Sequence, residues 1–266
     1  FWQSNIDGLL SNQTSFTTNS LSPGEHTITF QAQYSGSTNY TNPTRPPVDS
    51  DTWAMWRFDE GTGSSPDDST SNGYDGSFWC NSPSWTTDSR YGDYALEIDG
   101  AGNGCQGVEF SDDFGSGVPD AMTAEAWIKL DDLDRWHSIY SHYEDGYFRF
   151  YVNSDNKLTL YVHGSSIKSV VGSTELVSGV WYHVAATYSS TTDRIRVHLN
   201  GSVDGTTTLS SSYTMSNRNC CNNWIGYDSY WGTDYTFDGI IDEVRISSVE
   251  RTDFDHTTSY TYWSWS

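Results

Sequence analysis

The sequence has very little positive charge. Its 266 residues include 13 Lys and Arg against 35 Asp and Glu, which gives a formal net charge of −22. The only lysines are Lys129, Lys157 and Lys168. Nucleic acids and anionic membrane surfaces repel a polyanion of this strength, so we expect neither as a partner. The charge is compatible with cation binding, with a salty or calcium-rich medium, or simply with good solubility.

Long apolar runs and runs of helix-forming residues are also missing. No apolar stretch approaches the ~20 residues that cross a bilayer, so we expect no membrane insertion. No signal peptide is present and Phe1 stands first, so we expect a mature, cleaved or truncated piece. Ser, Thr, Asn and Gly are abundant, together with 12 Trp and 18 Tyr. Because these residues favour strands and turns, the composition predicts an all-β protein.

Cysteine is scarce, with four residues at Cys80, Cys105, Cys220 and Cys221. No CxxC pair occurs, which disfavours a structural zinc site. Four cysteines permit two disulfides in an exported protein. A bond between the adjacent Cys220 and Cys221 would be strained. We expect Cys80 and Cys105 to pair with each other or with the Cys220–Cys221 loop, and the connectivity stays open.

Three Asn-x-Ser/Thr triplets begin at Asn12, Asn39 and Asn200. Such triplets permit N-glycosylation of an exported chain, and Asn12 and Asn39 are the predicted sites. The same triplets also arise by chance in a sequence this rich in Asn, Ser and Thr.

Residues 1–35 read as a separate unit. Alternating patterns predict strands at Ser15–Thr18 and His26–Gln33, joined by a turn at Leu21–Gly24. The segment Trp2–Gly8, followed by Ser22–Phe30, resembles the C-terminal part of bacterial and archaeal Ig-like or PKD-type surface domains. The early strands of such a domain are missing, so the unit is a truncation remnant or takes strands from elsewhere. Residues 36–50 are polar and proline-containing, and we expect a linker there.

Strand signals recur through residues 51–250, and residues 251–266 are predicted to form a C-terminal tail. Asn200-Gly201 is a strong hairpin signal. About a dozen strands separated by turns predict a two-sheet antiparallel jelly-roll sandwich. The expected strands are Trp53–Phe58, Tyr94–Asp99, Val108–Ser111, Met122–Leu130, Tyr147–Val152, Lys157–His163, Trp181–Tyr188, Arg194–Leu199, Ser202–Thr208, Trp224–Tyr227 and Gly239–Ser247.

Seven short segments of this region follow one another in a recognisable order. They are Trp56–Gly61, Asp68–Gly76, Ala95–Gly100, Met122–Ile128, Gly179–Tyr188, Val197–Gly201 and Gly239–Ile246. Together they resemble the concanavalin A-like, laminin G-type domain of secreted and surface proteins. The resemblance implies a β-sandwich that binds glycans, proteins or matrix, or acts as a spacer, without fixing the ligand. Ser71 departs from the family, which usually has Gly there, so we expect this turn to differ.

The predicted closing strand Gly239–Ser247 contains an acidic residue. Period-two alternation places Ile240, Asp242, Val244 and Ile246 on one face, which we expect to be the core. A buried Asp242 carboxylate then needs a cation, an Arg or backbone N–H donors.

The family resemblance implies a structural calcium ion held by Asp242, by the loop that carries Asp68 and by backbone carbonyls. Asn72 and Asp75 of the loop Asp67–Asp75 offer further oxygen ligands of the kind calcium prefers, and Glu60 or Asp59 would add another. The alternative is that Asp242 only accepts backbone hydrogen bonds.

Many aromatic residues lie in or beside predicted loops. Flat rings stack on sugars and also anchor protein interfaces. The predicted ligand-binding residues are Trp136, Tyr143, Tyr230 and Trp231, and the same loops carry Tyr140, Tyr147, Tyr227 and Tyr235. His137 and His142 are expected in one of these loops. The alternative for each ring is packing onto the sandwich.

Catalysis is not expected. Concanavalin A-like glycosidases carry paired carboxylates on one strand face, whereas Glu125 and Glu243 each stand without such a partner. We therefore expect a non-catalytic extracellular or cell-surface module that recognises a glycan or an extracellular protein. The alternative is a structural subunit of a filament, sheath or surface layer, which self-associates by strand exchange through residues 1–35.

Overall fold

The computed structural model describes three short strands before residue 45 and then residues 45–100, 104–110, 119–142, 148–215 and 223–254. The chain divides into two compact units, one of Phe1–Asn42 with Ser259–Ser266 and one of Pro43–Thr258. No helix among the described residues has the length and apolar character needed to span a membrane.

The first unit contains a small antiparallel sheet. Strand β1 (Trp2–Ser4) pairs with both β2 (Gly8–Ser11) and β3 (Ile28–Phe30). Strand β3 lies within the predicted strand His26–Gln33. The predicted strand Ser15–Thr18 falls outside the described residues, and so do Asn12 and Asn39. The Ig-like or PKD-type assignment and the two glycosylation sites stay predictions.

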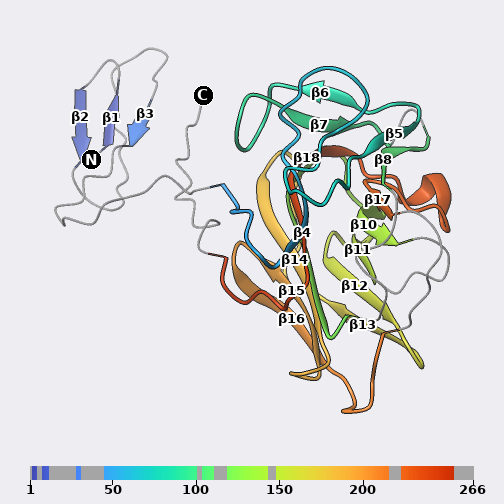
Figure 1. Cartoon of the computed structure of the whole chain (residues 1–266). Helices are drawn as coiled ribbons and strands as arrows, with labels where there is room; N and C mark the ends of the chain where they lie inside the picture. Colours follow the sequence, from blue (N-terminus) through green and yellow to red (C-terminus); the bar gives the residue numbers. More distant parts are fainter. Residues whose placement is uncertain are drawn as a thin grey trace. The chain divides into compact units, whose positions relative to one another are not determined.

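The second unit is a sandwich of two antiparallel sheets, which confirms the predicted all-β jelly-roll class (Figure 1). Seven strands form one sheet in the order β13-β12-β11-β10-β17-β8-β5. In that order they span Ile167–Val171, Leu158–His163, Phe148–Val152, His137–His142, Asn223–Ile225, Gln106–Phe110 and Ser77–Cys80.

The other sheet runs β16-β15-β14-β9-β18-β7-β6, with β4 also paired to β18. These strands span Ser202–Thr208, Arg194–Leu199, Trp181–Ser189, Ala121–Leu130, Gly239–Ser247, Ala95–Ile98 and Ser84–Thr86, and β4 spans Thr52–Trp56. A 3₁₀ turn, η1, covers Gly232–Tyr235.

The core lies between the sheets and follows the predicted alternation. In β9 the side chains of Met122, Ala124, Ala126, Ile128 and Leu130 all join one buried apolar cluster. From the opposite sheet, β11 and β12 contribute Phe148, Phe150, Val152, Leu158, Leu160 and Val162. Burial of this apolar surface, at about 25 cal/mol per Å², is the main stabilising term.

Two local predictions are confirmed. Asn200 and Gly201 have φ angles of 48° and 81° between β15 and β16, as a tight hairpin turn requires. A disulfide joins Cys80 at the end of β5 to Cys105 just before β8. This pairing was one of the two open alternatives. Cys220 and Cys221 lie outside the described residues.

One prediction about a loop is wrong. His137 and His142 bound a strand, β10, whose six residues are all buried. Tyr140, expected in a loop, packs on Phe110 and Phe148, and its hydroxyl donates a hydrogen bond of 2.6 Å to Asn223. The sequence of β10 is mostly polar and aromatic, so apolar alternation did not mark it; its pairing with β11 and β17 defines it.

The predicted facing of the closing strand β18 is right for Val244 and Ile246, which join the core, and wrong for Ile240 and Asp242. The pairing of β18 with β9 shifts between Asp242 and Arg245, and Glu243 has a φ of 52°. This β-bulge reverses the alternation, because Ile241 and Val244 both join the core cluster. Asp242 is fully buried. Because the preceding residue, Ile241, points into the core, Asp242 points to the outer face of its sheet.

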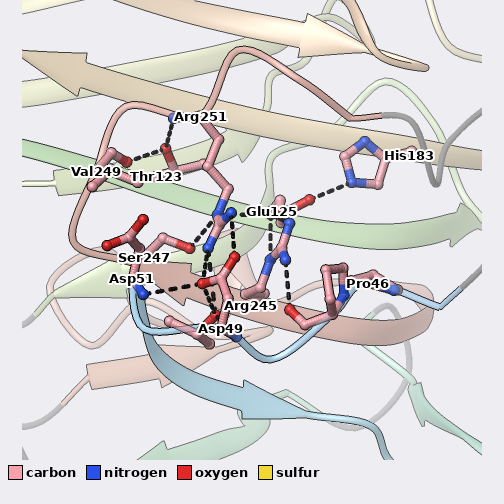
Figure 2. A network of polar contacts seen from close by, with 12 residues as sticks. Pro46, Asp49, Asp51, Thr123, Glu125, His183, Arg245, Ser247, Val249 and Arg251 are labelled. Carbon is pink, nitrogen blue, oxygen red and sulfur yellow. Dashed lines mark hydrogen bonds and ion pairs between the residues drawn. The ribbon is translucent and has the colours of Figure 1, made fainter.

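That outer face is covered by the chain segments that flank the sandwich (Figure 2). Arg245 of β18 donates to Glu125 of β9 at 2.6 Å and to the carbonyl of Pro47 at 2.7 Å. Arg251, beyond β18, pairs with Asp49 at 2.7 Å. Residues 45–50, predicted as part of a linker, thus pack on the sheet. These segments bury the outer face of the eight-stranded sheet at β9 and β18, whereas β16 at the edge of that sheet stays partly exposed.

Candidate functional site

Aromatic side chains gather on the outer face of the seven-stranded sheet. Strand alternation explains part of the gathering: Phe148 and Phe150 of β11 point into the core, so Arg149 and Tyr151 point outward. Tyr161 of β12 pairs directly with Arg149 on the same face. Trp136 before β10 and the loop after β17 add the remaining rings. We name Trp136, Tyr151, Tyr161, Tyr230, Trp231 and Tyr235 the aromatic cluster.

The rings of the aromatic cluster contact one another continuously. Tyr235 stacks with Trp136, with centroids 5.1 Å apart and planes at 24°, and with Trp231 at 5.3 Å and 18°. Tyr230 stands nearly perpendicular to Trp231, at 4.9 Å and 83°. Tyr151 meets both Trp136 and Tyr235 edge-on. Each such pair contributes about 0.5–1.5 kcal/mol beyond its buried area, so the cluster is a rigid unit.

Exposure divides the cluster into a base and a surface. Tyr151 is buried, and Trp136, Tyr161 and Tyr235 are partly buried. Tyr230 and Trp231 keep 53% and 49% of their surface exposed. Two large apolar side chains exposed side by side on a packed base are the usual mark of a contact surface.

A buried carboxylate holds the exposed rings in place. Asp228 is 1% exposed, and its Oδ1 accepts hydrogen bonds from the backbone N–H groups of Tyr230 (2.8 Å) and Trp231 (3.2 Å). Its Oδ2 accepts a hydrogen bond from the Tyr151 hydroxyl and lies 3.5 Å from Nε of Arg149. Asp228 therefore ties the turn that carries Tyr230 and Trp231 to strand β11.

The same loop is anchored to β10. The hydroxyls of Ser138 and Ser141 both donate to the carbonyl of Tyr227, at 3.0 and 2.8 Å. The anchors on β10 and β11 fix the start of the turn, and the N–H of Gly232 donates to the carbonyl of Asp228 at 2.8 Å beyond the two exposed rings. Both rings are therefore held in position before any ligand arrives.

Arg149 lies underneath Tyr230. Its guanidinium carbon is 4.8 Å from the centre of the Tyr230 ring, a cation–π distance. Its Nε and Nη2 have no hydrogen-bond acceptor within the part of the chain that the structure describes. Burial and the charge of Asp228 raise the pKa of Tyr151, so this phenol stays protonated and remains a donor to Asp228.

The structure brings together three of the four predicted ligand-binding residues, Trp136, Tyr230 and Trp231. Tyr143 lies outside the described residues. Sequence reasoning missed Arg149, Tyr151, Tyr161 and Asp228. The role of Asp228 could have been predicted from the sequence. An Asp in a turn commonly accepts a hydrogen bond on its side chain from the backbone N–H two residues later, which is an Asx turn.

The predicted calcium ligands are placed differently. Asp68 accepts hydrogen bonds from the N–H groups of Met55, Thr70 and Tyr74 and from the Thr70 hydroxyl. In this loop Gly73, rather than Ser71, takes a positive φ of 77°. Both oxygens of Asp68 are therefore occupied by loop hydrogen bonds.

The other three predicted ligands also have protein partners. Glu60 accepts from the N–H of Asp67, and Asn72 donates to the carbonyl of Trp53. Asp242 accepts from the N–H groups of Arg90 (2.8 Å) and Tyr91 (3.1 Å). Among the described residues, no three His, Cys, Asp or Glu side chains are grouped to hold a metal ion. As placed here, the predicted set does not fit calcium, which stays a prediction from the sequence.

Asp242 has an unusual electrostatic environment. Burial, followed by the nearby charge of Glu243, raises its pKa to about 8, although its backbone hydrogen bonds oppose the shift. Its Oδ1 is buried without a hydrogen-bond partner among the described residues. The raised pKa and the buried, unpartnered Oδ1 both favour the protonated form of Asp242.

The two glutamates considered for catalysis sit in buried ion pairs. Glu125 lies between Arg245 and His183, with 2.8 Å separating its Oε2 from His183 Nε2. Glu243 pairs with Arg57 at 3.0 Å and with Arg45. Both act as structural counter-ions under the covering segments.

Comparison with solved structures gives the same fold. Domain 4 of AbnA, a GH43 extracellular arabinanase from Geobacillus stearothermophilus solved with arabinotriose, aligns with a TM-score of 0.58 at 20% identity. The alignment covers 78% of this chain and 96% of that domain. The binding domain of Paraclostridial Mosquitocidal Protein 1 aligns with a TM-score of 0.57 at 10% identity over 76% of this chain.

A botulinum neurotoxin serotype D ligand binding domain, solved with N-acetylneuraminic acid, aligns with a TM-score of 0.56 at 12% identity over 78% of this chain. The chain spans about half the length of these two toxin domains (49% of each). At these identities the likeness concerns the fold.

Sequence comparison identifies the family. No match was found among curated proteins. A family model described as the concanavalin A-like lectin/glucanases superfamily matches residues 101–255, more than half of the chain. The matched region contains the aromatic cluster and both strands, β11 and β12, that form its base. The chain belongs to the concanavalin A-like lectin/glucanases superfamily.

Proposed function

We propose that the chain is a non-catalytic, extracellular recognition module that binds a glycan on the aromatic cluster. The observation that carries the proposal is the pair Tyr230 and Trp231, half exposed and fixed from below by Asp228. Sugar rings present apolar C–H faces and polar edges, and aromatic rings stack against those faces. A rigid pair of rings loses little conformational freedom on binding.

The rest of the molecule supports this choice of surface. At β9 and β18 the outer face of the eight-stranded sheet is covered by flanking segments, and Glu125 and Glu243 are neutralised there. The disulfide between Cys80 and Cys105 suits an oxidising, extracellular setting. Two structural neighbours of the same fold were solved with sugars bound.

The test is binding of the whole chain to a glycan array, compared with the variants Trp231→Ala and Tyr230→Ala. Each variant should lose at least about tenfold in affinity, as expected when an aromatic anchor is truncated. Trp79→Ala is the matched control, because Trp79 is a similarly exposed Trp (39%) on β5, at the far edge of the same sheet. An equal loss in the control, or no binding to any glycan by the folded chain, would reject the proposal.

The second candidate is a structural subunit that self-associates by strand exchange. It is favoured by the small sheet β2-β1-β3, whose outer strands β2 and β3 are edges among the described residues. An edge strand offers backbone groups to an added strand from another copy. Electron microscopy and light scattering of the full chain test it, and a monomer at all concentrations would reject it.

A further inference from the structure

We infer that the aromatic cluster selects uncharged glycans over acidic ones. The inference rests on the proposed function and names the class of ligand. It follows from where the charges around the two exposed rings lie and from which of them a ligand can reach.

Among the residues that the structure describes, the two arginines beside the cluster each have an acidic partner. Arg149 is 5% exposed, lies beneath Tyr230 and is ion-paired with Asp228 at 3.5 Å. Arg135, next to Trp136, donates to two backbone carbonyls and lies 3.9 Å from Asp238. Within the described part of the chain these groups leave no exposed, uncompensated cation to receive a carboxylate or sulfate.

Lys157 at the edge of β12 is the next cation along the same sheet. It pairs with Glu175 at 3.6 Å, so it too carries its own counter-ion. An acidic sugar that recruited Lys157 would have to displace that carboxylate. The Lys157–Glu175 pair therefore has no net attraction for an anionic sugar.

The rim of the cluster is acidic. The loop leading into Trp136 exposes Asp131, Asp132 and Asp134, and the η1 turn exposes Asp234 beside Tyr235. Asp134 is held by the side-chain amide of Asn156 at 3.0 Å. Asp234 lies close enough to Tyr235 to act on it electrostatically, and exposed charges repel an anion that comes within the screening length of about 8 Å at physiological ionic strength. They raise the free energy of bringing an anionic sugar to Tyr230 and Trp231.

Shape favours a neutral ring in the same place. Tyr230 and Trp231 meet at 83° and form a right-angled corner. A pyranose or furanose lays its C–H face on one ring and its edge against the other, with hydroxyls left in water. Such a contact gains apolar burial and needs no charge.

The test uses the full chain and pairs of oligosaccharides that differ only in oxidation at C6, β-1,4-mannan against β-1,4-mannuronan and β-1,4-glucan against β-1,4-glucuronan. We expect the neutral member of a pair to bind at least about tenfold more tightly. Its affinity should change less than about twofold between 50 and 500 mM NaCl, since no ion pair forms.

Tighter or equal binding of the uronate would overturn the inference while leaving the proposed function intact. Absence of binding to every glycan offered would reject the proposed function together with the inference.

A variant isolates the effect of the rim. The double change Asp134→Asn and Asp234→Asn should raise uronate affinity at least about threefold and leave neutral binding within about twofold. The matched control is Asp51→Asn with Asp67→Asn, which removes two exposed charges away from the cluster. An equal gain in the control would show a general charge effect and contradict the role of the rim.

Discussion

The buried carboxylate of Asp228 accepts a hydrogen bond of 3.2 Å from the backbone N–H of Trp231, whose indole is half exposed. One residue thus connects the interior to the surface where we propose that a glycan binds. Asp228 contacts no ligand in this scheme. It positions the rings that do.

Asp228→Ala should therefore weaken glycan binding at least about tenfold and destabilise the fold. The change frees the turn that carries Tyr230 and leaves Arg149 buried without its counter-ion, a loss of about 3–5 kcal/mol. Titration calorimetry measures the affinity, and urea unfolding measures the stability. Tyr151→Phe removes only one hydrogen bond to Asp228 and should cost about 1 kcal/mol with little effect on affinity. Wild-type affinity in a folded Asp228→Ala protein would contradict the positioning role.

Asp242 should make the protein less stable as the pH rises from about 4 to about 8. Its folded pKa of about 8 lies above the ordinary value of 3.8, so between them the folded state holds a proton that the unfolded state releases. Its contribution is fully present below pH 3.8 and is lost as the pH rises through 8. Asp242→Asn should remove this dependence, because the neutral amide does not titrate. Urea unfolding at pH 5, 7 and 9 measures it, and parallel curves for the two proteins would contradict the prediction.

Glu125→Ala should be strongly destabilising. Arg245 would be left 1% exposed without its carboxylate, and His183 would lose its partner at 2.8 Å. Breaking a buried pair from one side costs about 3–5 kcal/mol. Glu175→Gln is the matched control, since its exposed pair with Lys157 contributes less than about 1 kcal/mol. Similar unfolding free energies for the two variants would show that the covered network is not structural.

A calcium titration distinguishes the calcium site that the sequence predicts from the hydrogen-bonded loop that the structure shows. The hydrogen bonds that occupy Asp68 lead us to expect a melting temperature that changes by less than about 2 °C between calcium and a chelator. Asp68→Asn should lower it in both conditions equally, because the loss is in the loop hydrogen bonds. A melting temperature that rises with calcium concentration, and a loss of that rise in Asp68→Asn, would instead support the ion implied by the family.

Several features of the fold could be predicted because they are local. The alternation of Met122 to Leu130 and the Asn200–Gly201 turn each depend on a few neighbouring residues, and both are confirmed. Strand β10 was missed because its residues are mostly polar and its place in the sheet depends on distant partners. The predicted direction of the Asp242 side chain was wrong because a β-bulge at Glu243 exchanges the inward and outward positions of the residues that precede it in β18.

By itself, the sequence determined an all-β sandwich of the concanavalin A-like type and pointed to Trp136, Tyr230 and Trp231 as surface aromatics. Tertiary structure alone decided that these rings stack together and that Asp228 and Arg149 lie beneath them. It also decided that the outer face of the eight-stranded sheet is covered at β18. The physical reason is the range of the interactions. Alternation and turn geometry are encoded within a few residues, whereas ring stacking and buried ion pairs join segments that only the folded chain brings together.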